Sequence, residues 1–307
     1  MLVPHPIPYQ GSKRILASAI LSFFPSYVER LVEPFAGSGA LSLAAVASKR
    51  AENFHLNDVN ESLVRLWQEI FERPQTLADG YETLWRRQIG REREFYTEVR
   101  RAFNQTHQPA DFLYLLARCV KASVRYNAYG EFNQSPDNRR KGRHPDNMRH
   151  DILATSRLLA GRTILSSQDY GTLLTQVTVT DLVYLDPPYQ GVSQRRDARY
   201  VTQVQFHEFV QALYSLVERE ILFIVSYDGR RGDKVYGNGM PKDLNLRHIE
   251  IRAGRSTTST LLGGKDITYE SLYLSPALIR ELKIGAEKKS AHLSTQPTQL
   301  DLPLIAA

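Results

Sequence analysis

The chain of 307 residues contains a single cysteine, three methionines and two tryptophans, and none of its hydrophobic runs is long enough to cross a bilayer. One cysteine excludes a disulfide framework and favours a reducing compartment. Prolines interrupt the first six residues before the apolar part of a secretion signal could form. We therefore expect a cytoplasmic protein without a membrane segment.

Neither a metal centre nor a cysteine nucleophile is indicated. The histidines are scattered, and no Cys/His cluster has the spacing of a metal site, so we expect no bound metal. Cys119 lies in the apolar helical pattern of residues 112–120, where nothing nearby would activate a thiol. We expect it in the core.

The composition is that of a globular protein of one or two domains, with 42% hydrophobic and 23% charged residues. This length is sufficient for a substantial core. The net charge of +6 suits a polyanionic partner but does not by itself indicate one.

The hydrophobic periodicity predicts an α/β chain with a helical, basic middle section. Strand patterns lie at 28–32, 54–56, 163–165, 182–185, 221–225 and 269–274, and helical patterns lie at 13–24, at 40–47 and through most of 60–125. The alternation in 269–274 predicts an antiparallel strand at a sheet edge. Residues 126–150 predict a loop-rich surface, and the polar sequence after about residue 280 predicts a disordered tail.

A glycine turn, Glu33-Pro34-Phe35-Ala36-Gly37-Ser38-Gly39-Ala40, follows the first predicted strand. Gly37 and Gly39 allow a tight turn whose backbone N–H groups can approach a ligand. Asp58 ends the next strand, about 20 residues further on, where nucleotide-binding folds place a carboxylate for ribose hydroxyls. The alternative is that Asp58 caps the following helix, a role for which Asn57 and Asn60 compete. The absence of a third glycine favours an adenosyl ligand smaller than a dinucleotide.

The tetrapeptide Asp186-Pro187-Pro188-Tyr189 ends the apolar strand 182–185. Two prolines cannot continue a central strand, because each lacks a backbone N–H and fixes φ. The strand must therefore stop with a carboxylate, a rigid carbonyl and an aromatic ring at its C-terminal edge, which is where open α/β sheets bind ligands. The alternative is a tight turn after a core strand.

These motifs and their order resemble a known family. Residues 8–14 (Pro-Tyr-Gln-Gly-Ser-Lys-Arg) come first, then the glycine turn, then residues 126–133, and the DPPY tetrapeptide comes late. This order is similar to that of the Dam-like DNA adenine-N6 methyltransferases, over roughly residues 5–275. The resemblance implies a Rossmann-like methyltransferase sheet with an inserted, mostly helical DNA-recognition domain. It also implies S-adenosyl-L-methionine as cofactor and double-stranded DNA as substrate.

The resemblance assigns domains and residues. Residues 1–60 and 160–280 would form the catalytic domain, 61–159 the recognition domain and 281–307 a flexible tail. The expected cofactor-binding residues are Tyr9, Lys13, Phe35, Gly37, Gly39, Asp58, Asp169 and Asp186; the expected catalytic residues are Asp186, Pro187, Pro188 and Tyr189; Asn133 is expected to contact DNA. Asp169 would accept the cofactor's adenine amino group, although an aspartate that only forms a turn would look the same. For Lys13 the alternative is a solvated lysine at the start of a helix.

The chemistry of adenine methylation suits these residues. N6 is a poor nucleophile because its lone pair is delocalised into the ring. The Asp186 carboxylate and the Pro187 carbonyl could accept its hydrogens and turn the lone pair toward the methyl group, so that transfer depends mainly on positioning. Tyr189 would stack on a base flipped out of the duplex. Alternatives are a cytosine-N4 methyltransferase, an enzyme that methylates RNA or a protein amide, and a non-catalytic DNA-binding relative.

Positive charge collects in residues 136–150, which predicts a loop that contacts DNA phosphates. The basic residues expected to bind are Arg139, Arg140, Lys141 and Arg143. The alternatives are a solvated basic loop here and phosphate contacts from the arginines between residues 86 and 101.

The tail contains Gln299-Leu300-Asp301-Leu302-Pro303-Leu304, which resembles the short peptide by which bacterial proteins dock onto the replication sliding clamp. The alternative is an incidental hydrophobic end. We expect a monomer in the bacterial cytosol or nucleoid, and the motifs suit a lone methyltransferase and a restriction-modification enzyme equally.

Overall fold

The computed structural model of the chain describes every residue except 1–2, 189–203, 232–233, 237–238, 256–266 and 285–307. The predicted catalytic Tyr189 and the predicted clamp peptide at 299–304 thus lie outside the described residues. Among the described residues, no helix combines the length and hydrophobicity needed to span a membrane.

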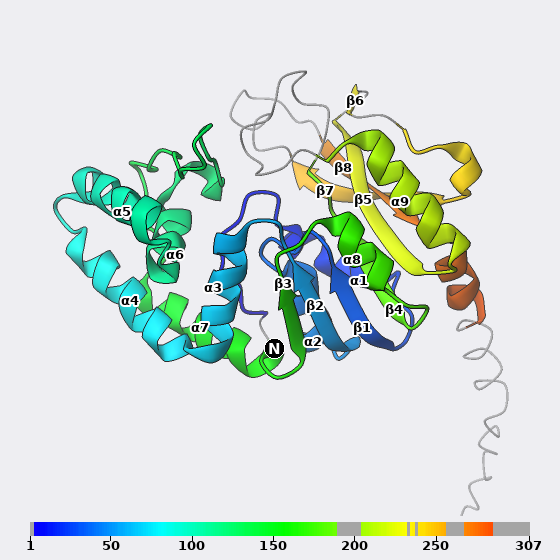
Figure 1. Cartoon of the computed structure of the whole chain (residues 1–307), viewed down its shortest axis with the longest axis horizontal. Coiled ribbons are helices and arrows are strands. Elements are labelled where there is room, and N and C mark those ends of the chain that lie inside the picture. The colour runs from blue at the N-terminus through cyan, green and yellow to red at the C-terminus, as the bar shows by residue number, and fades with distance from the viewer. Residues whose placement is uncertain (1–2, 189–203, 232–233, 237–238, 256–266, 285–307) are drawn as a thin grey trace, which may run out of the picture.

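One twisted sheet organises the protein (Figure 1). Its strands are β1 (Val28–Glu33), β2 (Ala51–Asn57), β3 (Thr163–Ser166), β4 (Asp181–Leu185), β5 (Leu222–Arg231), β6 (Lys234–Tyr236), β7 (Arg247–Arg255) and β8 (Ile267–Leu274). They lie in the order β3-β2-β1-β4-β5-β8-β7, and β6 pairs with β5. The first five of this order are parallel, and β8 runs antiparallel to both of its neighbours.

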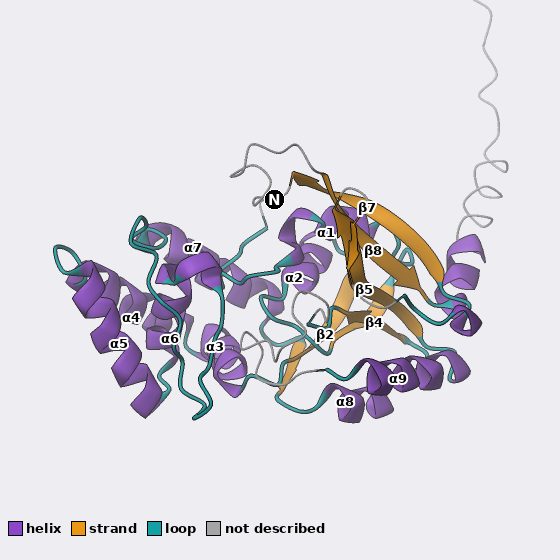
Figure 2. Ribbon diagram, turned by 90° about the horizontal axis from the view of Figure 1, so that it is seen from above, coloured by secondary structure: helices purple, strands orange, loops and turns teal. Residues whose placement is uncertain are grey.

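Helices cover both faces of this sheet. Along the chain the helices are η1 (Lys13–Ile15), α1 (Ala17–Leu21), α2 (Ala40–Ala47), α3 (Glu61–Glu72), α4 (Pro74–Arg87), α5 (Glu92–Thr106), α6 (Pro109–Arg118), η2 (Val120–Ala122), α7 (Pro145–Leu159), α8 (Tyr170–Gln176), α9 (Phe206–Glu218) and η3 (Lys242–Leu244), and residues 276–284 are also helical. Figure 2 shows α1 and α2 on one face and α8 and α9 on the other. The Rossmann-like sheet with a mostly helical insertion, predicted from the sequence, is confirmed.

The strands alternate between the two hydrophobic layers. On β4, Leu182 and Tyr184 belong to the core beneath α1 and α2, whereas Val183 and Leu185 belong to the core beneath α8 and α9. Burial on both faces explains why β4 reads as an unbroken apolar run after its first residue. That first residue, Asp181, is buried and receives two hydrogen bonds of 2.7 Å from Arg30 of β1.

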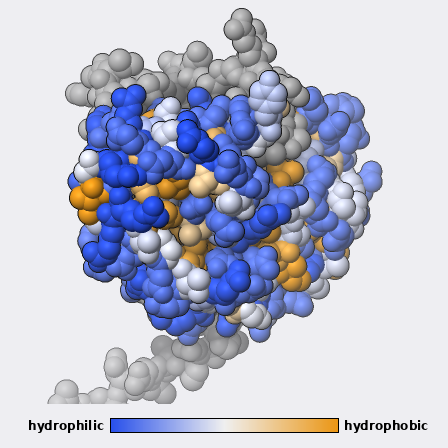
Figure 3. Space-filling view, turned by 60° about the vertical axis from the view of Figure 1, so that its left-hand side comes forward, coloured by the Kyte–Doolittle hydropathy of each residue, from blue (hydrophilic) through white to orange (hydrophobic). Residues whose placement is uncertain are grey.

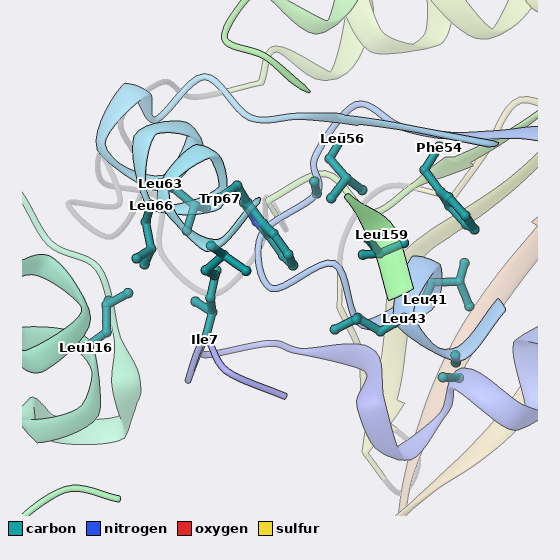
Figure 4. Close-up of a cluster of buried hydrophobic side chains, with 14 of the residues drawn as sticks. Ile7, Leu41, Leu43, Phe54, Leu56, Leu63, Leu66, Trp67, Leu116 and Leu159 are labelled. Carbon is teal, nitrogen blue, oxygen red and sulfur yellow. The ribbon is translucent and has the colours of Figure 1, made fainter. Parts of the chain in front are cut away.

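We call α4–α7, residues 74–159, the helical module. The hydrophobic core runs from the sheet into this module through α3, as Figure 4 shows: Trp67 and Leu66 of α3 lie between Leu56 of the sheet and Leu116 of α6. Cys119 is buried in the same core, as predicted, and burial raises the pKa of its thiol to about 12. The domain boundaries at residues 60 and 160 stay predictions.

Two sequence predictions about elements were wrong in part. The strand pattern at 269–274 is antiparallel as predicted, but β8 is not the edge, because β7 pairs with its outer side. β7 was missed because its sequence, Arg-His-Ile-Glu-Ile-Arg-Ala-Gly-Arg, offers only two large apolar residues. The predicted loop 126–150 ends earlier, since α7 begins at Pro145, a residue that suits the first helical position.

Candidate functional site

A cavity opens at the C-terminal edge of the parallel strands, where β1 and β4 are neighbours although their chain connections run in opposite directions across the sheet. In open α/β sheets this switch point is where ligands bind. Segments after β1, β2, β3 and β4 line the cavity, together with residues 9–13. The sequence-predicted residues among its lining are Tyr9, Lys13, Phe35, Gly37, Asp58, Asp169, Asp186, Pro187 and Pro188.

The glycine turn is shaped by its surroundings. Gly37 and Gly39 have φ values of +50° and +56°, which favour glycine. A Cβ at Gly39 would lie 2.8 Å from the ring of Trp67, so a side chain there would collide with α3. The Trp67 indole N–H also donates to the Gly37 carbonyl at 3.0 Å, and Tyr9 packs against Gly37 from the cavity side. Gly39 thus supports the turn from behind and does not line the cavity.

Asp58 holds the turn from the end of β2. Its carboxylate accepts hydrogen bonds from the backbone N–H of Gly37 at 3.1 Å and of Asn60 at 2.9 Å. The cap of α3 is Asn60, whose side chain accepts from the Ser62 N–H, so Asp58 is not the helix cap. Burial raises the pKa of Asp58 to about 6, against the opposing effect of these two N–H donors. Its ribose-binding role stays a prediction.

Asp169 lies at the end of β3 and borders the cavity. Its side chain accepts from the Gly171 N–H at 2.8 Å and caps α8. The alternative of a turn-forming aspartate is therefore realised by one carboxylate oxygen, and the contact of Asp169 with a cofactor stays a prediction.

Lys13, Asp186 and Glu270 form a largely buried ion triad. The Lys13 ammonium lies 2.9 Å from Asp186 Oδ1 and 3.0 Å from Glu270 Oε1. Lys13 is buried in the site, which excludes its reading as a solvated lysine. Burial alone would lower the pKa of Lys13, but Asp186 and Glu270 reverse this effect and raise it above its ordinary value. For Asp186, burial raises the pKa to about 6, with Lys13 opposing the shift and Glu270 adding to it.

Glu33 is a buried carboxyl in the cavity wall that sequence reasoning did not single out as a site residue. It ends β1 and accepts from the backbone N–H of Ser42 at 2.9 Å and from the Ser42 hydroxyl. Burial raises its pKa to about 7, although the hydrogen bonds from Ser42 oppose the shift. Glu270 was also missed. The available signal was a carboxylate directly after the predicted strand 28–32 for Glu33, and a carboxylate on the same side of the strand as Leu272 and Leu274 for Glu270.

The predicted DNA-binding residues divide into two groups. Arg139 and Arg140 have side chains 87% and 80% exposed, near Asp137. Lys141 instead pairs with Glu92 at 2.9 Å, and Arg143 pairs with the buried Asp151 at 2.8 Å. Asn133 is exposed on the same loop. Figure 3, which brings this side of the molecule forward, shows mainly hydrophilic residues with separate hydrophobic spots.

A short hairpin projects from the same loop, closed by the bridge between Tyr126 and Phe132. The Asn127 side chain accepts from the N–H groups of Tyr129 and Glu131, so the turn is held by its own side chain. Tyr129 at the tip is 89% exposed. Sequence reasoning did not single it out, because aromatic exposure depends on the surrounding fold.

Two hydrogen bonds join residues 122–126, which lead into this hairpin, to residues that line the cavity. The backbone N–H of Gln10 donates to the Ala122 carbonyl at 2.9 Å. The Tyr126 hydroxyl donates to the Asn60 side chain at 3.2 Å. The chain that leads into the hairpin is thus held against two walls of the site.

A Rossmann-like sheet with a glycine turn after β1 and an Asp-Pro-Pro sequence after β4 is the arrangement of a protein that binds a nucleotide-like ligand at the switch point. Comparison with known families identifies the group: residues 9–246 match the model of the D12 class N6 adenine-specific DNA methyltransferases. The chain belongs to this family. A methyl donor and a DNA substrate follow from the family.

Individual relatives agree with this assignment. The chain is 28% identical to a DNA N-6-adenine-methyltransferase of Escherichia phage P1 over 78% of its own length, a match that spans only 30% of the phage protein. It is 25% identical to the retron Ec67 DNA adenine methylase of Escherichia coli, covering 83% of this chain and 88% of the relative. It is also 26% identical to the type II methyltransferase M1.LlaDCHI of Lactococcus lactis, covering 83% and 90%.

Proposed function

We propose that the protein transfers the methyl group of S-adenosyl-L-methionine to N6 of an adenine that is flipped out of duplex DNA at a specific site. The observation that carries the proposal is the position of Asp186. It follows β4 at the switch point, 2.9 Å from Lys13, and borders the same cavity as the glycine turn and Asp58. The family match supports adenine over cytosine-N4 as the target and supports an enzyme over a non-catalytic relative.

The cavity suits an adenosyl methyl donor. Gly37 keeps the turn free of a side chain, and Asp58 retains acceptor capacity for ribose hydroxyls beyond its two N–H bonds. Phe35 and Tyr170, with ring centroids 5.2 Å apart, offer an apolar surface for a purine. When bound there, the cofactor supplies a methyl group activated by a positively charged sulfur, and the carboxylates of the wall favour that charge.

Asp186 and Pro187 prepare the target amino group. The Asp186 carboxylate accepts one amino hydrogen and the Pro187 carbonyl the other, so that the N6 lone pair points toward the methyl group. Lys13 keeps Asp186 ionised by direct contact. Because these acceptors are fixed before the base arrives, the enzyme gains mainly from orientation and electrostatic preorganisation. Tyr189 is proposed to stack on the base, which cannot be reached inside the duplex.

The basic loop of residues 136–144 and the Tyr126–Phe132 hairpin are proposed to contact the DNA. Arg139 and Arg140 extend into solvent and are available for phosphates. Asn133 and the exposed Tyr129 lie close to them in the sequence. One stretch of chain therefore offers positive charge, a side-chain amide and an aromatic ring for contacts with DNA.

Nucleoside mass spectrometry tests this function. Duplex DNA is incubated with the protein and with the cofactor carrying a deuterated methyl group, then digested to nucleosides. We expect labelled N6-methyl-2′-deoxyadenosine. Labelled N4-methyl-2′-deoxycytidine, or no labelled nucleoside from DNA that contains every short site, would contradict the proposal.

We further propose, from the sequence alone, that the peptide at 299–304 docks onto the replication sliding clamp and that the enzyme acts as a monomer in the cytosol or nucleoid. A fluorescent peptide covering residues 294–307 should bind purified clamp saturably. Peptides with Leu302→Ala or Leu304→Ala should not. Equal binding by these controls would remove the clamp proposal and leave the enzymatic one unchanged.

A further inference from the structure

The sheet face beneath α1 and α2 becomes polar at the edge that borders the cavity. Each strand first contributes apolar side chains to the core and then a polar one toward this edge. The series are Leu182 and Tyr184 along β4 with Asp186 directly after it, Ile224 and Ser226 along β5, and Leu274, Leu272 and Glu270 along β8. Glu270 therefore occupies a position at which the pattern of β8 would place another apolar residue.

A bulge in β5 sets the position of Glu270. Ser226 pairs with Leu272 and Gly229 pairs with Glu270, so β5 advances by one residue more than β8 between the two pairs. Such bulges bend a strand and redirect side chains next to active sites. Here the carboxylate of Glu270 lies 3.0 Å from the Lys13 ammonium, and its side chain is 13% exposed.

Two carboxylates thus share one ammonium. Lys13 lies 2.9 Å from Asp186 and 3.0 Å from Glu270, and its own side chain is 9% exposed. Because water is largely excluded from these side chains, the electrostatic interactions among the three charges are strong. If Lys13 interacted with Asp186 alone, the whole effect of its positive charge would act on Asp186. Asp186 is the carboxylate that has to accept the hydrogens of the target amino group.

We infer that Glu270 is a positioning residue for methyl transfer: by sharing the Lys13 ammonium with Asp186, it keeps Asp186 a strong hydrogen-bond acceptor for the target amino group. The inference rests on the proposed function, in which Asp186 accepts from N6. Glu270 itself contacts Lys13 and acts through it.

Burial raises the pKa of Asp186, and the charged groups around it change that pKa further. Among the described residues these groups are Lys13 of η1, Glu270 of β8 and Glu33 of β1, while the phenol of Tyr184 on β4 acts on Lys13. Lys13 lowers the pKa of Asp186 and Glu270 raises it. Removing the charge of Glu270 therefore lowers the pKa of Asp186, and with it the strength of the acceptor. The same cause predicts a slower reaction and an acid limb of the pH–rate profile at lower pH.

The test compares Glu270→Gln, Glu270→Asp and wild type in the full-length protein. We expect Glu270→Gln to lower kcat about tenfold and to move the acid limb of kcat to lower pH, with cofactor affinity, measured by calorimetry without DNA, within about threefold. Glu270→Asp keeps the negative charge, but its side chain is one methylene shorter, so the carboxylate lies further from Lys13. It should retain the wild-type acid limb and show an intermediate kcat.

Glu220→Gln is the matched control. Glu220 lies just before β5, at the opposite edge of the sheet, and forms an ion pair with Arg280. It should leave kcat and the pH profile unchanged. Wild-type kcat in Glu270→Gln, or a lower kcat with an unmoved acid limb and a lower melting temperature, would overturn the inference. If Glu270→Gln does not fold, an unchanged kcat in Glu270→Asp would overturn it. A wild-type protein without methyl transfer would instead contradict the proposed function.

Discussion

Asp186 combines an ion pair with Lys13, a position directly after β4 and access to the cavity. We expect Asp186→Ala to lower kcat by about 10²–10³-fold, because a fixed acceptor for the target amino group is lost. Cofactor affinity should stay within about tenfold, since the main partner of Asp186 is the target base. Single-turnover methylation and cofactor calorimetry measure the two effects. Near-wild-type turnover in this variant would contradict the mechanism.

The pH dependence of the reaction follows from the same carboxyl. Burial raises the pKa of Asp186 from its usual value near 4 to about 6. Protonation removes the acceptor, so kcat should fall as pH decreases through about 6 and level off above about 7. A kcat–pH profile with saturating DNA and cofactor measures this. A flat profile from pH 5 to 8 would show that Asp186 does not need to be ionised.

Glu33 gives a prediction about stability. Burial raises its pKa to about 7, so the folded protein holds this proton more tightly than the unfolded chain does. The stabilisation from the protonated form is present below about pH 4.5 and is lost as pH rises through about 7. Glu33→Gln cannot ionise and should exceed the wild type in free energy of unfolding by about 2–3 kcal/mol at pH 8, but not at pH 4.5. Urea unfolding at the two pH values measures the difference, and equal stabilities at pH 8 would contradict it.

At the scale of elements, the glycine turn depends on the helix behind it. A Cβ at Gly39 would meet the Trp67 ring at 2.8 Å and would also require a left-handed backbone. We expect Gly39→Ala to lower the free energy of unfolding by about 3 kcal/mol and to weaken cofactor binding.

The matched control is Gly161→Ala. Gly161 has a φ of +81° and nothing within 4 Å of an added Cβ, so this variant carries only the backbone cost of about 1 kcal/mol. Urea unfolding of both variants separates collision from backbone strain. Equal losses of stability would show that Trp67 does not restrict the turn.

The sequence predicted elements and site residues where the signal was local. The glycine turn, Asp58, Asp169 and Asp186 each follow a hydrophobic strand, and strand ends of a parallel sheet meet at one edge. Glu270 could not be assigned in this way, because its contact with Lys13 depends on the pairing of β8 beside β5 and on a bulge. β7 was missed because an edge strand needs few apolar residues.

At the scale of the whole molecule, the structure refines the predicted DNA surface. The double variant Arg139→Ala, Arg140→Ala should weaken DNA binding and reduce the slope of log K against log salt by up to about 1.8, since each phosphate contact contributes about 0.9. Its melting temperature should not change. Fluorescence anisotropy at several salt concentrations measures the slope, and an unchanged slope would move the phosphate contacts to other basic residues.

Arg143→Ala serves as the contrasting variant. Arg143 pairs with the buried Asp151 at 2.8 Å, and Asp151 also accepts from the His5 N–H, so removal of the partly exposed Arg143 should destabilise the fold by about 1–2 kcal/mol and lower the melting temperature. Its sequence position next to Arg139 and Arg140 gave no indication of this difference, because the partner lies on α7. Differential scanning fluorimetry distinguishes the two variants.

Trp67, whose indole N–H donates to the Gly37 carbonyl at 3.0 Å, can also report on the glycine turn through its fluorescence. The chain has two tryptophans, and the other, Trp85, lies on α4 against His144. In a Trp85→Phe variant all indole emission would therefore come from a ring packed on the turn proposed to hold the cofactor. Titration with cofactor should shift the emission intensity or wavelength without any added dye, and stopped-flow recording would then resolve the rate of cofactor entry before DNA is present.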